Sequence, residues 1–317
     1  MKVSSKLEFP YDIITATSLS TIAAVLSYLG LFFYFKYPYS LFFFNLIFVS
    51  TGLIVSYIIE FRRIRLLSVA YIVMVLAFVD GFLLSSAYAL YGIMLAFGGF
   101  LVLPLFGALL RNRGEDVRIV LEACGILFAI KIVLFPFPVQ VLDSALILPI
   151  AYTILVTGIM LYVWFRRISL DKVGLWRGTT KLSWQMLAGI ASGLLLGLFQ
   201  YLVLSPKANS IGPNLLQNIV YVAIFMIVFV GLTEELLFRG IIQTHMTGFL
   251  TQGQSIYVTS IIFSLFQIGW SNPFEILSAF LVSSVFGYLM MKTNSLISPV
   301  LAHGLSNVTL YLLALRF

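Results

Sequence analysis

The sequence predicts an all-α fold, a polytopic transmembrane bundle of about eleven helices (ten to twelve), and three observations carry this prediction. Of the 317 residues, 61% are hydrophobic and only 10% are charged, whereas a soluble domain has about 25% charged residues. The mean hydropathy is +1.06. The apolar residues fall into stretches of about 20 residues, the length with which an α-helix crosses the hydrocarbon core of a bilayer.

The candidate spans are separated by charged residues or helix breakers, such as Lys36-Tyr37-Pro38, Arg111-Asn112-Arg113-Gly114 and Asn272-Pro273. Their apolar composition and length predict a multi-pass integral membrane protein, with the cell membrane as the expected location. In chain order the predicted spans lie near residues 13–35, 41–59, 66–86, 88–110, 119–135, 143–164, 184–204, 216–243, 254–270, 274–291 and 295–315.

The distribution of basic residues predicts the orientation of these spans. With the N-terminus inside and the C-terminus outside, fourteen of the nineteen Lys and Arg residues lie on the inner side. Only Lys36, Lys207 and Arg316 lie outside, and Lys131 and Arg239 fall within spans. This bias follows the positive-inside rule. The net charge of +7 is therefore explained by loops that face anionic lipid, and no nucleic-acid partner is expected.

The longest polar connection, residues 166–183, divides the chain into two predicted regions. Residues 1–168 form a six-span membrane region of unknown role, and residues 169–317 form a five-span region that contains most of the unusual polar residues. The single cysteine, Cys124, excludes an intrachain disulfide and a cysteine-based metal cluster, and we expect it to be a buried thiol. The sequence leaves the oligomeric state open.

Three ionisable residues follow the apolar run 219–230 within one predicted span: Glu234, Glu235 and Arg239. Each such group at the centre of a membrane helix costs about 2.5–3.5 kcal/mol on insertion scales, so three within six residues indicate a site. Residues four apart share a helical face, which predicts an ion pair between Glu235 and Arg239. Glu234 points to another face and remains available for general-base chemistry.

Two later spans carry further polar residues at the same spacing of four. His303 and Asn307 share one face of the last span, and Gln267 follows Phe263 by four residues in the ninth. The 1.5 Å rise per residue places these side chains and Glu234 at similar depths, which predicts one polar cavity open towards the cytoplasmic half. An interhelical structural network is the alternative for all of these groups.

Together these residues resemble the signature of a known family. The three motifs, Glu234-Glu235-x-x-x-Arg239, Phe263-x-x-x-Gln267 and His303-x-x-x-Asn307, are similar to those of the CPBP family of CAAX proteases and bacteriocin-processing enzymes. This family includes the type II CAAX prenyl endopeptidases. The resemblance covers about residues 170–317, including a Val173-Gly174-Leu175-Trp176-Arg177 segment of the kind that precedes the family's core.

The resemblance implies an intramembrane endopeptidase that acts on a peptide or a lipidated protein in the bilayer. It implies that Glu234 is the general base that activates water and that His303 and Asn307 stabilise the oxyanion. Glu235 and Arg239 then hold the geometry. No cofactor is expected. The family's second motif ends in histidine, and Gln267 replaces it here. Glutamine can position a water molecule but cannot transfer a proton near neutral pH.

This departure leaves two alternatives open. Either Glu234 handles the proton while Gln267 positions the water, or the protein keeps the fold and binds such segments without cutting them. A zinc site would need about three ligands, and only His303, Glu234 and Glu235 could supply them, with Glu235 expected to bind Arg239. We therefore predict no metal.

Four further ionisable residues are not assigned to the site. Asp80, Glu122 and Lys131 are expected to form structural pairs, either with one another or at helix ends. A transport path through these three residues and Glu234 is the less favoured reading, because we find no paired inverted repeats with interrupted helices. His245 is expected to be a solvated residue near the inner end of its helix.

Overall fold

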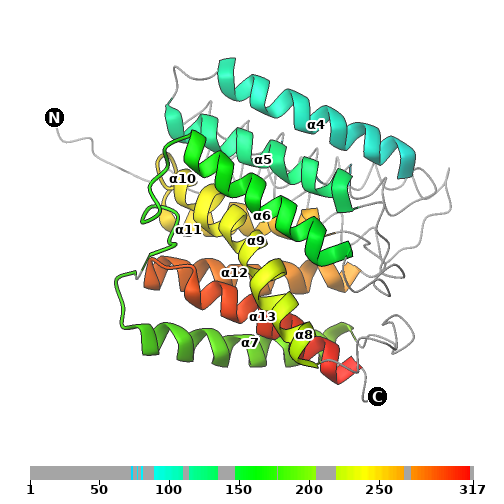
Figure 1. The fold of residues 1–317 in the computed structure, drawn as a ribbon, viewed down its shortest axis with the longest axis vertical. Coiled ribbons are helices and arrows are strands. Elements are labelled where there is room, and N and C mark those ends of the chain that lie inside the picture. The colour runs from blue at the N-terminus through cyan, green and yellow to red at the C-terminus, as the bar shows by residue number, and fades with distance from the viewer. Residues whose placement is uncertain are drawn as a thin grey trace, which may run out of the picture. The chain divides into compact units, whose positions relative to one another are not determined.

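The computed structural model describes residues 89–109, 114–134, 147–176, 178–204, 219–267 and 273–314, together with residues 73, 77 and 80. Every regular element in these ranges is helical (Figure 1), which confirms the all-α prediction. The chain divides into two compact units, Met1–Val75 and Leu76–Phe317, and all the helices below belong to the second unit. The first three predicted spans lie outside the described residues, apart from those three single positions. The predicted division after residue 168 stays a prediction.

The described helices coincide with the remaining eight predicted spans. Three of these helices, α4, α5 and α6, precede the long polar connection, and the others follow it. A continuous helical segment over residues 219–246 comprises five shorter elements, whose junction residues keep helical backbone angles. The separate helices are α4 (Ala89–Leu109), α5 (Glu115–Leu134), α6 (Ile147–Phe165), α7 (Leu182–Leu204), α11 (Gln252–Phe266), α12 (Pro273–Thr293) and α13 (Ile297–Ala314).

Four helical segments among the described residues are long and apolar enough to cross a membrane: Gly92–Leu109, Leu182–Leu204, Phe274–Thr293 and Ile297–Ala314. A shorter apolar helix covers Pro149–Phe165. Many large apolar side chains of α4 and α7, including Leu105 and Leu195, are exposed, as lipid-facing residues are. These features fit an integral membrane protein. The predicted number of about eleven spans and their orientation stay predictions.

Helices α7 and α13 pack side by side along their length (Figure 1), and three glycines of α7 make this possible. Gly189, Gly193 and Gly197 repeat every four residues, so they share one face. A Cβ atom on Gly193 would lie 2.8 Å from the backbone oxygen of Ala302, and one on Gly197 would lie 2.6 Å from that of Ser306. Small residues at this spacing let membrane helices approach closely. The glycine face therefore fixes the position of α13.

Helix α13 also approaches the long helical segment closely, and again glycine is required. A Cβ atom on Gly304 would lie 2.5 Å from the Cα atom of Ile227, and one on Gly231 would lie 3.0 Å from the backbone oxygen of Val300. The two backbones therefore touch at this crossing. Because His303 precedes Gly304 and Glu234 follows Gly231 by three residues, the crossing brings these two motif residues together.

The buried charges of α5 are satisfied by structural pairs. Lys131 Nζ lies 2.7 Å from Asp80 Oδ2, and both side chains are buried. Glu122 binds Arg118 at 2.9 Å and also binds Arg166 at the end of α6. These contacts confirm the prediction that Asp80, Glu122 and Lys131 form structural pairs. Cys124 is fully buried on α5, as expected.

The described residues of the Val173–Arg177 segment singled out in the sequence, residues 173–176, belong to the connection before α7. Gly174 and Gly178 adopt positive φ angles of 75° and 70°, which side chains disfavour. The Gly174 carbonyl accepts a hydrogen bond from the Leu296 amide at 2.8 Å, so this connection is tied to the turn between α12 and α13. A Cβ atom on Gly240 would lie 2.8 Å from the Val173 carbonyl oxygen, so the segment also packs on the long helical segment.

Candidate active site

The glutamate pair lies between two π-helical stretches. The long helical segment runs through α8 (Ile219–Ile224), η5 (Phe225–Gly231), α9 (Leu232–Glu235), η6 (Leu236–Gln243) and α10 (Thr244–Met246). π-Helical turns are rare and occur often at functional sites. The sequence predicted one regular helix over residues 216–243, because apolar periodicity does not distinguish a π turn from an α turn.

Glu235 is completely buried and binds two cationic or polar partners through one oxygen. Its Oε1 atom lies 2.9 Å from Arg239 Nη1 and 2.7 Å from His303 Nδ1. The first contact is the ion pair predicted from the spacing of four. A buried carboxylate without such partners would be strongly destabilising. Glu235 is therefore an ionised anchor that joins the long helical segment to α13.

Arg239 is also completely buried and extends the network to α12. Its Nη2 atom donates hydrogen bonds to the Ser283 carbonyl at 2.9 Å and to the Ser283 hydroxyl at 2.5 Å. The guanidinium carbon lies 4.8 Å from the ring centre of Phe263 and 5.4 Å from that of Phe286. Cations at such distances are attracted to aromatic faces. The sequence analysis missed Ser283 and Phe286, because a serine and a phenylalanine in an apolar helix carry no distinguishing signal.

The His303 ring is held by aromatic side chains and by Glu235. It stacks on Phe286, with ring centres 5.2 Å apart and an interplanar angle of 19°, and it meets Phe263 edge-on at 5.8 Å. Because Glu235 is ionised, it accepts the hydrogen bond, and His303 Nδ1 carries the proton. The other nitrogen, Nε2, is therefore the one that faces Glu234.

Glu234 is placed differently from its neighbour. Its side chain is 24% exposed, whereas that of Glu235 is not exposed. The Oε2 atom lies 3.9 Å from His303 Nε2, which is longer than a hydrogen bond. The Oε1 atom accepts a hydrogen bond from the Tyr152 hydroxyl of α6 at 3.4 Å. The predicted difference between the two glutamates is thus present. Glu235 is buried and bound to two partners, whereas Glu234 is partly exposed beside the imidazole of His303.

The structure brings together Glu234, Glu235, Arg239 and His303, but the second motif differs from the prediction. Helix α11 ends at Phe266, and Gln267 has an extended backbone with φ −61° and ψ 128°. Gln267 therefore does not continue the helical face of Phe263, as the predicted span 254–270 required. The sequence that follows contains the breakers Gly269 and Asn272-Pro273, which favour an early helix end.

Asn307 lies one turn after His303 on α13 and is partly buried. Among the contacts of the described residues, none joins the Asn307 or Gln267 side chain to the other four. The roles assigned to all six residues stay predictions.

His245 corrects one expectation. It was predicted to be solvated, but its side chain is buried, and Nδ1 lies 2.8 Å from the Ile241 carbonyl oxygen one turn earlier. The helical segment continues to Met246, three residues beyond the predicted end, and α10 packs against α5. The neighbouring helix therefore covers a residue that hydropathy alone placed at the surface.

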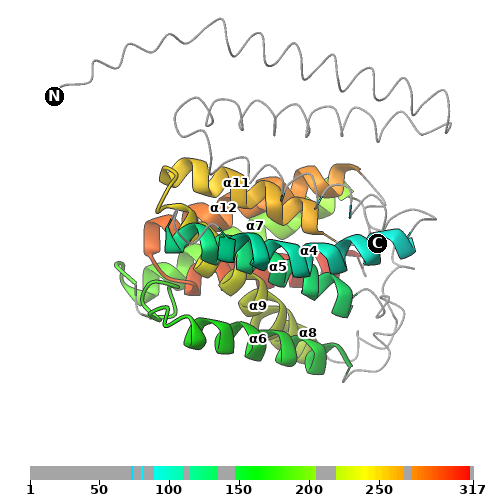
Figure 2. The same cartoon turned by 90° about the horizontal axis from the view of Figure 1, so that it is seen from above.

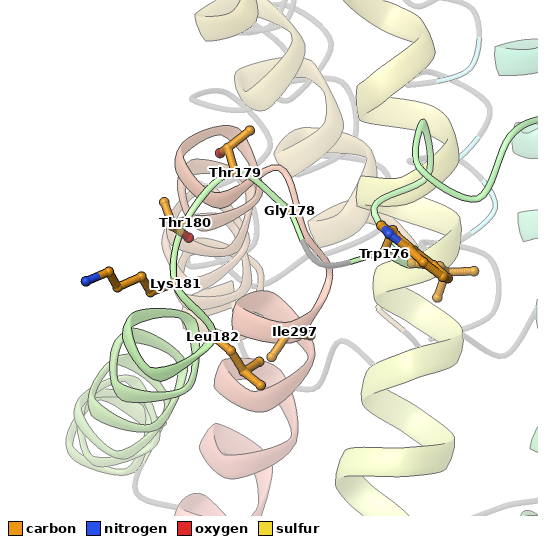
Figure 3. Close-up of a pocket in the computed structure, with 8 residues that line it drawn as sticks. Trp176, Gly178, Thr179, Thr180, Lys181, Leu182 and Ile297 are labelled. Carbon is orange, nitrogen blue, oxygen red and sulfur yellow. The ribbon is translucent and has the colours of Figure 1, made fainter.

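A pocket of about 850 Å³ has no motif residue in its lining (Figure 3). It is formed by the connection before α7, the start of α7 and the start of α13. The lining residues are Leu175, Trp176, Gly178, Thr179, Thr180, Lys181, Leu182 and Ile297. The predicted polar cavity around Glu234 stays a prediction.

Comparison with known families agrees with the motifs. The family model described as type II CAAX prenyl endopeptidase Rce1-like matches residues 216–309, a range that contains all three motifs. The comparisons with curated proteins and with solved structures gave no match. Residues 216–309 are therefore similar to the Rce1-like family of type II CAAX prenyl endopeptidases, which confirms the resemblance carried by the three motifs.

Proposed function

We propose that this protein is an intramembrane endopeptidase that hydrolyses a peptide bond in a membrane-associated substrate, such as a prenylated or C-terminally anchored protein. One observation supports the proposal most directly. His303 lies between the two glutamates, with Nδ1 2.7 Å from Glu235 and Nε2 3.9 Å from Glu234. Water activation needs a base beside an imidazole of fixed orientation. Glu234 is the partly exposed carboxylate that can act as the base, and the buried carboxylate of Glu235 holds the His303 ring.

In the proposed reaction, Glu234 takes a proton from a water molecule as the water oxygen attacks the carbonyl carbon of the scissile bond. The carbonyl electron pair moves onto oxygen, and the resulting oxyanion is stabilised by the Asn307 amide and by His303 in its imidazolium form, in which Nε2 carries a proton in addition to the one on Nδ1. The tetrahedral intermediate then collapses. The carbon–nitrogen bond breaks, and the Glu234 carboxyl returns the proton to the leaving nitrogen.

Gln267 is proposed to position the attacking water. Its amide can both donate and accept a hydrogen bond, so it can orient a water molecule while Glu234 carries the proton alone. The same replacement of histidine supports a second candidate function, in which a protein of this fold captures membrane-anchored segments without cutting them. The experiment below distinguishes the two functions.

The residues present do not fit a zinc site well. Among the described residues, no group of three or more His, Cys, Asp or Glu side chains could hold a metal ion. Glu235 Oε1 already accepts from Arg239 and His303, and the charge of Arg239 offsets that of the carboxylate. Glu234 and His303 Nε2 alone are fewer than the roughly three protein ligands that zinc prefers. We therefore propose a reaction without a metal.

The proposed substrate reaches the site laterally from the bilayer or from the cytoplasm, in an eleven-span arrangement with the N-terminus inside and the C-terminus outside. The hydropathy pattern and the positive-inside bias support this arrangement. The printed description of the matching family, a prenyl endopeptidase, supports a prenylated substrate. The proposed location is the cell membrane.

The test is cleavage of a farnesylated reporter peptide by the purified full-length protein in detergent, with the same peptide lacking the prenyl group as a comparison. Wild type, Glu234→Ala and Gln267→His are assayed together. Cleavage by wild type that Glu234→Ala abolishes supports the proposal. Cleavage by Gln267→His alone overturns the active-protease proposal and favours the binding function.

A further inference from the structure

Tyr152 is a side chain from outside the family-matched region that reaches the candidate active site. Its hydroxyl donates a hydrogen bond to Glu234 Oε1 at 3.4 Å. Tyr152 belongs to α6, whereas the family match begins at residue 216. Figure 2 shows α6 alongside α9, and the structure records contacts of α6 with both η5 and α9. The hydroxyl therefore approaches Glu234 from a helix that none of the three motifs includes.

The ring of Tyr152 is fixed by the same helical segment that carries Glu234. Tyr152, Phe225 and Val230 form one buried apolar cluster. The Tyr152 and Phe225 rings meet edge-on with centres 5.7 Å apart and an interplanar angle of 89°. Phe225 in turn stacks on Phe229 in η5, with ring centres 6.0 Å apart. Because Tyr152 is only 9% exposed and packs within this cluster, its hydroxyl has a defined position.

The hydrogen-bonding groups define which oxygen of Glu234 is free to act. A carboxylate only accepts hydrogen bonds, so the Tyr152 hydroxyl must donate its proton to Oε1. The second oxygen, Oε2, is then the one turned towards His303 Nε2 at 3.9 Å. Hydrogen bonds to an ionised group are stronger than those between neutral groups. Tyr152 therefore restrains the carboxylate in the orientation in which Oε2 meets the water.

We propose that Tyr152 is a positioning residue for Glu234, and that α6 thereby supplies part of the active site from the region before the family match. This inference rests on the proposed function, because Tyr152 affects the reaction only through the proposed general base, Glu234. Catalytic groups must be held within about 0.5 Å of the productive geometry by neighbouring side chains. A hydroxyl from a separate helix is suited to this role.

The test compares Tyr152→Phe with Tyr162→Phe in the full-length protein. Tyr162→Phe is the matched control, because Tyr162 also lies on α6 and its hydroxyl also donates a hydrogen bond to a carboxylate of another helix, that of Glu122, at 2.9 Å. Each substitution keeps the ring and removes one hydroxyl. We expect Tyr152→Phe to lower kcat about tenfold or more with KM changed less than about twofold, because a hydrogen bond to a charged group is lost.

The pH profile adds a readout that a purely structural role would not change. Without the Tyr152 hydroxyl, the ionised form of Glu234 loses a donor, so the acid limb of the kcat/KM profile should move to higher pH. Tyr162→Phe should keep the wild-type profile and rate. Equal kcat for Tyr152→Phe and wild type, or a change confined to KM, would overturn the inference.

A thermal double-mutant cycle keeps this inference separate from the proposed function. Tyr152→Phe, Glu234→Gln and the double variant are unfolded in detergent. Effects on the unfolding midpoint that are not additive support the contact, and additive effects overturn the inference, whether or not wild type cleaves a peptide. An inactive wild type overturns the proposed function alone, and the cycle still decides whether Tyr152 acts on Glu234.

Discussion

Glu235 Oε1 and His303 Nδ1 lie 2.7 Å apart, although 68 residues separate them in the chain. The contact joins the long helical segment to α13 at the point where Gly231 and Gly304 let the two backbones touch. It fixes the His303 tautomer and turns Nε2 towards Glu234. A buried carboxylate therefore determines the orientation of the imidazole that its partly exposed neighbour faces.

The first prediction concerns the buried ion pair. Glu235→Gln leaves the Arg239 charge buried without its counter-ion, so it should destabilise the protein by about 3–5 kcal/mol. The double variant Glu235→Gln with Arg239→Met should be more stable than Glu235→Gln alone, because the unpaired charge is removed. Unfolding in detergent measures both variants. A double variant less stable than Glu235→Gln alone would contradict the assignment of this pair.

The second prediction concerns the shape of the Arg239 side chain. Arg239→Lys keeps the charge but loses the planar fork that binds both Glu235 and Ser283, and it loses the flat contact with Phe263. We expect a clear fall in the unfolding midpoint and in peptidase activity. Lys172→Ala, which removes the exposed pair with Asp116, is the control and should change stability by about 1 kcal/mol or less. Equal effects of the two substitutions on stability would show that the contacts of Arg239 contribute no more than an exposed ion pair does.

The third prediction concerns the crossing of η5 and α13. A Cβ atom on Gly304 would lie 2.5 Å from the Ile227 Cα atom, so Gly304→Ala must push α13 away. His303 would then move relative to Glu234, and misplacement by about 1 Å can cost roughly 100-fold in rate. The matched control is Gly158→Ala on α6, where nothing lies within 4 Å of the added Cβ atom.

Peptide cleavage and thermal unfolding of both glycine variants check this prediction. Gly158→Ala should behave as wild type does, while Gly304→Ala should lose activity by at least tenfold. Wild-type activity in Gly304→Ala would mean that the crossing does not set the geometry of the site.

The fourth prediction concerns metal removal. If Glu234 activates water without a metal, dialysis against EDTA or 1,10-phenanthroline should leave the cleavage rate within about twofold, because fewer than the roughly three ligands that zinc needs are available. The rate is measured on the farnesylated reporter peptide before and after chelation. Loss of activity that added Zn²⁺ restores would show instead that the site uses a metal.

The sequence alone determined the helices and the features that depend on local spacing. Apolar stretches gave the positions of α4 to α7 and of α11 to α13, because hydropathy and helix length follow directly from composition. The Glu235–Arg239 pair was predictable since residues four apart share a helical face. The different placement of Glu234 followed from the same geometry, and the three motifs indicated the family.

Only the tertiary structure decided the contacts between helices. The hydrogen bond of Tyr152 to Glu234 and the stacking of His303 on Phe286 join residues that no local pattern relates. The end of α11 before Gln267 and the burial of His245 also differ from the expected pattern. Helical periodicity fixes which residues of one helix share a face, but the approach of separate helices depends on how their surfaces pack, as at Gly304 against Ile227.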